Sequence, residues 1–406
     1  MLPQVALLEV AGCLGTRDRV AMGQVCAAWR HALGAPCNWR SADVVVNEDL
    51  PGAVAGAVAR HCRHVRCLRL AWRRRDPAGW TWGGHARAAE RFLAALAEGA
   101  AQLRELHLVD WAHGYNWGSR PRILRAVAAF LRSQEQLQVL KLCNTNFSVK
   151  DAARLVRRAG GALRHLGLCR AFGLAKLPPG TADYLGLLRQ LHGLAVLELD
   201  YSSVSGAALG LLAGGSGPGL RALRLAVDQR DVARAVPDAV WGRLAAACPA
   251  LRVSITVVNI SNHEDLLVFL LPSIPLHSFS LSSGAVWNQN RSRKFRHTLR
   301  HILNCYWMRL VSLHLNLRNN MEVLDDLILE VIESCPRLLN FKFEGILYDL
   351  HTIKDICDLH LSTSTNFQKI QVHAKKCCED NKLLIEELRK EYTHKLSERN
   401  VYFKVE

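Results

Sequence analysis

The chain has 406 residues, of which 50% are hydrophobic and 22% are charged, which is the composition of a globular protein and excludes a disordered chain. Its formal net charge of +16 permits attraction to nucleic acid, anionic lipid or acidic protein segments but specifies no fold. The longest apolar stretch, residues 265–276, is too short for a membrane span and contains prolines. The start lacks the basic region of a secretory signal, and the thirteen cysteines form no framework. We therefore expect a cytoplasmic or nuclear protein with no membrane partner.

The first forty residues predict a compact helical unit. Pro3 stands where a first helical turn tolerates proline, and Leu7, Val10 and Leu14 follow it at helical spacing. A unit of this size is too small to be stable alone, so we expect it to pack on the segment that follows.

A second helix is predicted in the same unit, with Asp18 as its candidate cap. Val25, Cys26 and Trp29 form an apolar stripe on this helix, which we expect to be buried. Cys26 also lies near two further soft donors, His31 and Cys37, but the three lack the paired close spacing of a zinc site, and we predict no metal.

From residue 65 onward, one hexad recurs at intervals of about 25 to 38 residues, which is typical of a repeat protein. It reads apolar, two variable, apolar, one variable, apolar, as in "VRCLRL" at Val65 and "LVSLHL" at Leu310. Each hexad ends in the period-two pattern of a strand with one buried face. Segments such as "RILRAVAAFL", with apolar residues at helical spacing, lie between the hexads. About eleven strand–helix repeats in order predict a leucine-rich-repeat solenoid, closed by a capping helix and a strand near residue 402.

These patterns predict an α/β chain with three segments: a helical domain at 1–41, a connecting segment at 42–64 and the solenoid at 65–406. The alternative is a doubly wound parallel sheet, which would need longer strands and no fixed hexad. Within the repeats, "CPAL" at Cys248 and "CPRL" at Cys335 mark places where a helix ends and a strand begins. We interpret both cysteines as small buried residues.

The variable position between the last two apolar residues of each hexad suggests a binding surface, because these side chains point to the face opposite the core. Glu198 is the only acidic residue at this position, whereas most of the others are basic or histidine. We hypothesise that this face binds an acidic or phosphorylated protein segment; the alternative is a solvated sheet face. The candidate residues are Arg69, His107, Lys141 and Arg224.

A second candidate surface is a group of tryptophans that follow the first two hexads. Trp72, Trp80, Trp82, Trp111 and Trp117 lie there, with three arginines at 73–75 among them. Trp72 and Trp111 are candidates for contact with a substrate. The alternatives are that the tryptophans pack the loops onto the repeats or, with less support, that they bind nucleic acid.

No catalytic constellation is recognisable, so we expect a chain that is not an enzyme and uses no cofactor. The glycine-rich stretch at 214–219 lacks the lysine of a phosphate-binding loop. "HAKKCC" at His373 offers three soft donors but no second pair.

The helical unit resembles the F-box motif in the order and spacing of its residues, which are Leu2-Pro3, Leu7, Val10, Leu14, Asp18, Val25-Cys26, Trp29 and Trp39-Arg40. An F-box followed by leucine-rich repeats is similar to the substrate receptors of Skp–cullin–F-box ubiquitin ligases. The resemblance implies a Skp-type adaptor, a cullin scaffold with its RING subunit and a protein substrate as partners. It implies adaptor contacts by Leu2, Pro3, Leu7, Val10, Leu14, Val25 and Trp29.

The chain departs from the family pattern at three positions of the first helix. Val5 and Ala6 stand where the family favours an acidic residue and leucine, and Ala11 stands where it favours phenylalanine. By analogy with the family we expect these side chains to face the adaptor. The departures leave an alternative open, in which the chain is a protein-interaction scaffold outside any ubiquitin ligase and the helical unit is only an N-terminal cap.

Overall fold

The computed structural model describes residues 3–50, 52–72, 82–111, 120–172, 180–215, 219–284, 293–320, 322–362, 366–375 and 379–406. The chain folds into two compact units, Met1–Leu199 (unit 1) and Asp200–Glu406 (unit 2). Within the described residues, no helix is long and apolar enough to cross a membrane.

Unit 1 begins with the predicted helical unit, which consists of three short helices and a 3-10 turn: α1 (Gln4–Cys13), α2 (Thr16–Val25), α3 (Ala27–Leu33) and η1 (Pro36–Trp39). Pro3 is the residue before α1, as the sequence indicated, but Asp18 does not cap α2. Gly15 is the N-cap residue instead. Asp18 lies in the first helical turn, where its negative charge interacts favourably with the positive end of the helix dipole.

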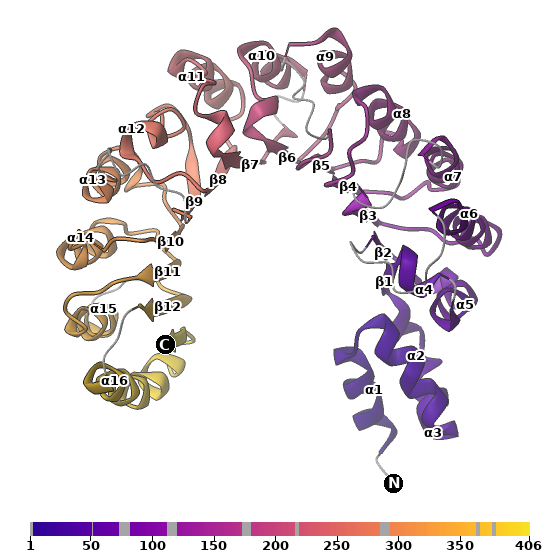
Figure 1. Cartoon of the computed structure of the whole chain (residues 1–406), viewed down its shortest axis with the longest axis horizontal. Coiled ribbons are helices and arrows are strands. Elements are labelled where there is room, and N and C mark those ends of the chain that lie inside the picture. Colours follow the sequence, from indigo (N-terminus) through magenta and orange to yellow (C-terminus); the bar gives the residue numbers. More distant parts are fainter. Residues whose placement is uncertain are drawn as a thin grey trace. The chain divides into compact units, whose positions relative to one another are not determined.

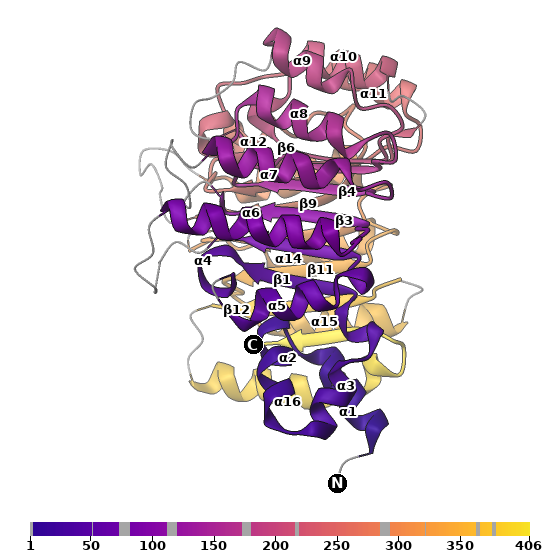
Figure 2. The same ribbon diagram turned by 90° about the vertical axis from the view of Figure 1, so that its right-hand side faces the viewer.

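Parallel strands follow the helical unit and pair with one another in chain order. The strands are β1 (Ser41–Val45), β2 (Cys67–Ala71), β3 (Glu105–Val109), β4 (Val139–Cys143), β5 (His165–Gly167) and β6 (Val196–Asp200). The helices between them are α4 (Val46–Asp49), α5 (Ala53–Arg60), α6 (Trp82–Glu98), α7 (Arg120–Arg132), α8 (Val149–Ala159) and α9 (Ala182–Leu188). The longer helices cover one face of the strand layer, and Figure 2 shows α6, α7 and α8 side by side on it.

The segment 42–64, predicted as a connection, contains almost all of β1 and the whole of α5. β1 pairs with β2 along its length, so the repeats begin one strand before the first hexad. The sequence analysis missed this strand because "SADVVV" lacks the leucines of the hexad. Ala42 and Val44 are nevertheless buried, as alternate residues of a strand with one buried face are.

Unit 2 repeats the same arrangement, again with strands in one layer and helices on one face (Figure 1). Its strands are β7 (Ala222–Asp228), β8 (Arg252–Val258), β9 (Leu276–Ser282), β10 (Ser312–Asn316), β11 (Asn340–Gly345), β12 (Lys369–Ala374) and β13 (Tyr402–Val405). Its helices are α10 (Gly206–Gly215), α11 (Asp238–Ala247), α12 (His263–Leu266), α13 (Phe295–Tyr306), α14 (Asp325–Ser334), α15 (His351–Ser362) and α16 (Glu379–Ser397). The expected closing helix and strand are α16 and β13.

The hexad leucines form columns in the core because the strands pair in equal register. Leu68, Leu106, Leu140 and Leu166 occupy the same position in successive strands, and each is 0% exposed. The strand–helix repeat of the leucine-rich type is thereby confirmed. The alternative of a doubly wound sheet is excluded within each unit, because consecutive strands are neighbours and the long helices of each unit cover one face of its sheet.

Cys248 and Cys335 follow α11 and α14 directly and are both buried, as the sequence indicated. Burial raises the pKa of both thiols, that of Cys335 to about 11, so they are protonated and unreactive at neutral pH.

The helical unit is fastened to the first repeat through polar contacts of α2. Arg17 donates hydrogen bonds to the carboxylate of Asp49, with its Nη2 lying 2.6 Å from Oδ1. The second carboxylate oxygen of Asp49 accepts a hydrogen bond of 2.7 Å from the backbone N–H of Val45. Thr16 accepts one of 2.8 Å from the N–H of Asp43 in β1. Trp39 adds an apolar contact, stacking on His61 at 4.4 Å between ring centroids.

Replacement of Asp49 by alanine should loosen this junction. Asp49 is 4% exposed, so its loss leaves the Val45 N–H and part of the Arg17 guanidinium without their acceptor. We expect a loss of about 1–3 kcal/mol in stability and faster amide hydrogen exchange in α2. Glu386→Ala, which removes an exposed ion pair with Arg389 on α16, serves as the control and should change stability by less than about 1 kcal/mol. Equal exchange in α2 for wild type and Asp49→Ala would contradict the assignment.

Candidate functional site

The residues expected to contact an adaptor fall into two sets: some are buried within the helical unit, and others are exposed on its surface. Leu7 is 6% exposed and packs inside the unit, whereas Leu14 and Trp29 are half-buried. Val10 and Val25 are 42% and 68% exposed. Pro3 is also exposed, and Leu2 lies outside the described residues. The outer residues give this unit an aliphatic surface that nothing in its own fold covers.

Two expectations about this unit are corrected by the structure. Ala11 was expected to face an adaptor, but it is 0% exposed, so its small side chain belongs to the interior of the unit. Val25 and Cys26 were expected on a buried stripe with Trp29, but both are exposed. The cause is local: Cys26 has an extended backbone that separates α2 from α3, so helical periodicity does not run through it.

The open strand face of unit 1, the face opposite its helices, carries charged side chains that neutralise one another. Arg69 lies 3.0 Å from Asp43 on the neighbouring strand. Lys141 and His165 lie 3.1 and 2.8 Å from the same carboxylate oxygen of Glu198. The basic residues predicted to bind an acidic partner therefore already have acidic neighbours within the fold.

A glycine between two strands makes the Lys141–Glu198 pair possible. Lys141, Gly167 and Glu198 occupy equivalent positions on β4, β5 and β6, so the ion pair must pass over the middle strand. A Cβ atom at Gly167 would lie 3.1 Å from Cγ of Lys141 and 3.2 Å from Oε2 of Glu198. Any larger residue at Gly167 would therefore crowd both partners.

Glu198 is the most strongly perturbed acid of this face. Burial acts to raise the pKa of Glu198, but hydrogen bonds from His165 and Lys141 outweigh it and lower the pKa to about 2. Its side chain is 11% exposed, so it is shielded from solvent at the centre of this network. The network fixes a buried negative charge and leaves little of Lys141 available for a ligand.

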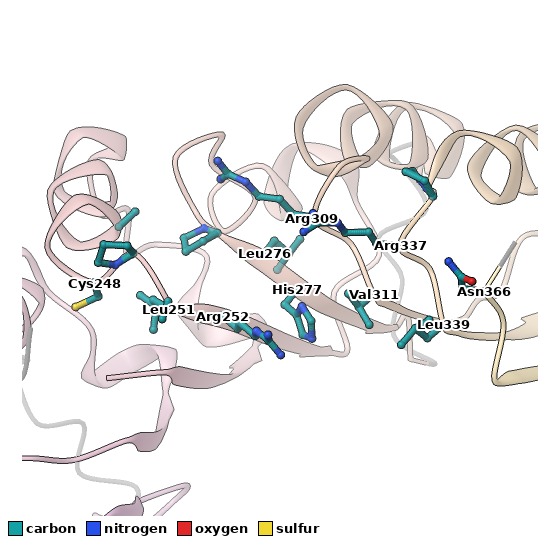
Figure 3. A pocket seen from close by; sticks show the side chains of 15 residues that line it. Cys248, Leu251, Arg252, Leu276, His277, Arg309, Val311, Arg337, Leu339 and Asn366 are labelled. Atoms are coloured by element: carbon teal, nitrogen blue, oxygen red, sulfur yellow. The ribbon is translucent and has the colours of Figure 1, made fainter. Parts of the chain in front are cut away.

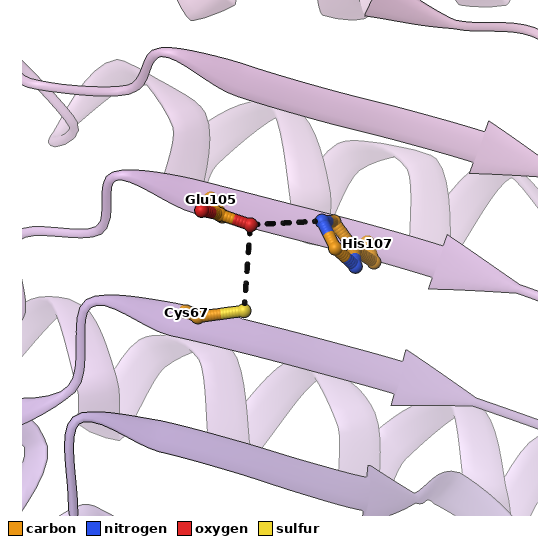
Figure 4. A group of neighbouring side chains, drawn as sticks. All are labelled: Cys67, Glu105 and His107. Atoms are coloured by element: carbon orange, nitrogen blue, oxygen red, sulfur yellow. Dashed lines mark hydrogen bonds and ion pairs between the residues drawn. The ribbon is translucent and has the colours of Figure 1, made fainter. Parts of the chain in front are cut away.

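Cys67, Glu105 and His107 form a cluster on the same face (Figure 4). Cys67 faces Glu105 across the β2–β3 ladder, with Sγ 3.7 Å from Oε2, and His107 Nε2 lies 3.4 Å from the same oxygen. Burial and the Glu105 charge raise the pKa of Cys67 and hold it as a thiol. Burial and the charge of Lys141 lower the pKa of His107. The donor types suit zinc, but the neighbouring Arg69 and Lys141 oppose a divalent cation, so we interpret the cluster as part of the neutralised face.

The open face of unit 2 is arranged in the same way. Glu344 lies beside Lys342 and 3.8 Å from His314, and it accepts a hydrogen bond of 2.8 Å from Asn316. Arg224, the remaining candidate on this face, has interactions within the fold as well.

Of the five tryptophans in the second candidate surface, two are buried, and the side chains of the other three lie outside the described residues. Trp72 is 2% and Trp111 0% exposed, and their rings meet edge to face at 6.2 Å between centroids. Trp111 also donates a hydrogen bond of 2.9 Å to the carbonyl of Leu70. We therefore correct the expectation that these two contact a substrate: they pack the ends of the loops onto the repeats. Trp80, Trp117 and residues 73–75 lie outside the described residues, as does the side chain of Trp82.

A groove in unit 2 was missed by the sequence analysis. It has a volume of about 760 Å³ and lies beside the starts of β8 to β11 and the segment before β12. Arg252, Arg309 and Arg337 line it together with His277, and Figure 3 shows their side chains along the groove. The signal in the sequence was an arginine next to the first hexad leucine, recurring at Leu251, Leu310 and Leu338.

The stabilising effect of the ionised Glu198 side chain should decrease when the pH is lowered. Because the pKa of Glu198 is lowered to about 2, its stabilising effect is fully present above its unfolded value near 4.5 and is lost as pH falls toward 2. Wild type should therefore be more stable than Glu198→Gln at pH 6, by about 3 kcal/mol at most, and the difference should shrink steadily below pH 4.5. Urea unfolding of both proteins from pH 6 to pH 2.5 measures it. A difference independent of pH would contradict the assigned ionisation.

Comparison with known proteins identifies no family, and the solved structure described below is only weakly similar to this chain. No family model matches the chain. The solved structure entitled "Crystal structure of TLR13-ssRNA13 complex" is similar to it with a TM-score of 0.34 and 12% sequence identity, over 78% of this chain. The chain spans 50% of the length of that protein. At this distance the likeness adds nothing to the repeat fold, which rests on the strands and helices themselves.

Proposed function

We propose that the chain is the substrate-recognition subunit of a Skp–cullin–F-box ubiquitin ligase. The helical unit would dock on the Skp-type adaptor and thereby join the cullin scaffold and its RING subunit, while the repeats hold a protein substrate. The chain performs no chemistry itself. Its contribution is proximity, because it raises the effective concentration of substrate lysines near the ubiquitin-loaded enzyme. The proposal places the protein in the cytoplasm or nucleus.

The observation that carries this proposal is the exposed aliphatic surface of the helical unit. Val5, Val10 and Val25 are three of the ten large hydrophobic side chains that are exposed among the described residues. All three lie in the first twenty-five residues of the chain. Val5 and Val10 lie on different sides of α1 and Val25 ends α2, so the support comes from the concentration of exposed valines in one small unit, which leaves apolar side chains for a partner protein to cover.

The resemblance to F-box proteins is a second line of support for the proposed function. The segments "LGTRDR" at Leu14, "VWG" at Val240, "SIPLHSFSL" at Ser273 and "FRHTL" at Phe295 resemble F-box only protein 39 in particular. The family favours phenylalanine at the position of Ala11. Because Ala11 is buried, this difference affects the interior of the helical unit and leaves its outer surface unchanged.

A second candidate function is that of a protein-interaction scaffold outside any ubiquitin ligase. The contacts of Arg17 and Thr16 with the first repeat favour it, because they allow the helical unit to serve as an N-terminal cap of the solenoid. The two functions differ in whether the exposed valines have a partner.

Substitution of the exposed valines separates the two functions. We expect the full chain to co-purify with a Skp-type adaptor in a stoichiometric complex. The double variant Val10→Asp, Val25→Asp should bind the adaptor at least about tenfold more weakly, since it places two charges in an apolar interface. Its melting temperature should stay close to that of wild type, because both side chains are exposed.

Val258→Asp is the matched control, because Val258 is exposed to the same 42% as Val10 but lies on β8 in unit 2. It should leave adaptor binding unchanged. A wild-type chain that binds no adaptor would overturn the ligase proposal and leave the scaffold function.

A further inference from the structure

The groove of unit 2 is built from equivalent positions of successive repeats. Arg309 and Arg337 each precede a hexad leucine by one residue, and their strands pair with Ser312 opposite Asn340. The two arginines therefore hold the same place in neighbouring repeats. Arg252 begins β8, and His277 lies on β9, next to its first residue. The groove thus presents a row of cationic or polar side chains across four strands (Figure 3).

The arginines of the groove differ from the cations of the open strand faces because their charges are not neutralised. Arg252, Arg309 and Arg337 are exposed, and none makes an ion pair or side-chain hydrogen bond with any residue that the structure describes. Among the described residues, no aspartate or glutamate lines the groove. Burial and the charge of Arg252 lower the pKa of His277, so this ring is neutral at pH 7 and can donate or accept a hydrogen bond.

Apart from Asn366, the rest of the described lining is mostly apolar. Leu251 and Leu276 are buried side chains, and Val311 and Leu339 continue the row on the next two repeats. Pro249, Pro275 and Pro336 also line the groove, and their rings restrict the backbone. A preformed groove of this kind loses little conformational freedom when a ligand binds.

We infer that this groove binds an extended acidic segment of a partner protein through Arg252, Arg309 and Arg337. Arginine forms two parallel hydrogen bonds to a carboxylate or a phosphate, so both aspartate or glutamate and phosphorylated side chains fit this chemistry. The distance from β8 to the segment before β12 corresponds to four strand spacings of about 4.8 Å, or roughly 19 Å. An extended peptide of about six residues covers this length, with apolar side chains on the half-buried Val311 and Leu339.

A protein segment fits the groove better than nucleic acid does. Binding of single-stranded nucleic acid uses aromatic side chains as stacking platforms, and no tryptophan, tyrosine or phenylalanine is among the described residues that line this groove. The inference rests on the proposed function only in taking the partner to be a protein, and it holds without an adaptor.

A peptide-binding experiment on the full chain tests the inference. The probe is a library of fluorescein-labelled eight-residue peptides, whose positions vary among aspartate, glutamate, phosphoserine, leucine, glutamine and lysine. We expect selection of peptides with at least two acidic or phosphorylated positions. Matched peptides carrying glutamate or phosphoserine at the same positions show which anion the groove prefers. The triple variant Arg252→Glu, Arg309→Glu, Arg337→Glu should bind the selected peptides at least about thirtyfold more weakly.

The control variant carries the same change of charge at exposed cations away from the groove: Arg318→Glu, Lys354→Glu, Lys390→Glu. Its affinity for the selected peptides should stay within about threefold of wild type. Equal losses in both triple variants, or no peptide bound below about 100 μM, would overturn the inference. So would tighter binding of oligouridine than of any peptide with the same dependence on the three arginines. Peptide binding is measured without adaptor, so failure here is distinguishable from failure of the ligase proposal.

Discussion

Burial of one apolar strand face through stacking of neighbours is the constraint on which this structure depends. A single strand–helix repeat has leucines on one side of a short strand and cannot shield them from water by itself. Parallel pairing in equal register places Leu68, Leu106, Leu140 and Leu166 in one column, and all four are inaccessible to solvent. Each such leucine contributes about 1.5–3 kcal/mol on burial.

Equal register also determines what the polar side chains can do. Residues between the hexad leucines fall into rows across the strands, so acids and bases placed there meet one another, as Lys141 and Glu198 do across Gly167. Arg309 and Arg337 lie three residues before their strands and outside these rows. They have no acidic neighbour among the described residues, although they belong to the same repeats. The net positive charge is therefore locally neutralised on the open faces and remains unpaired in the groove.

The repeats were predictable because their signal is strong and redundant, whereas the candidate sites were only partly predictable. The hexads located ten of the strands, and an alternating segment and the expected closing strand indicated β8 and β13, but β1, in which alanine and valine replace leucine, was missed. Periodicity alone could not show that α2 ends at Val25, because the spacing of apolar residues does not mark the extended backbone of Cys26. The side chains opposite the core were predicted, but their ion pairs were not. Asp43 and Glu105 lie outside the positions that the hexad marks, and the Lys141–Glu198 pair passes over Gly167 on the strand between them. The groove is formed by side chains from several repeats, so the sequence of one repeat does not indicate it.

β13 is the last strand of unit 2 in chain order. β13 pairs with β12 on one side only among the described residues, and its outer backbone groups could template pairing with another chain. Tyr402, Lys404 and Glu406 are exposed along this strand, and Lys404 forms an ion pair of 2.6 Å with Glu406. Charged side chains at a sheet edge oppose edge-to-edge association, because a second chain docking there would have to remove them from water. The sequence "VYFKVE" thus combines a buried face that completes the core with an outer face that resists further growth of the sheet by aggregation.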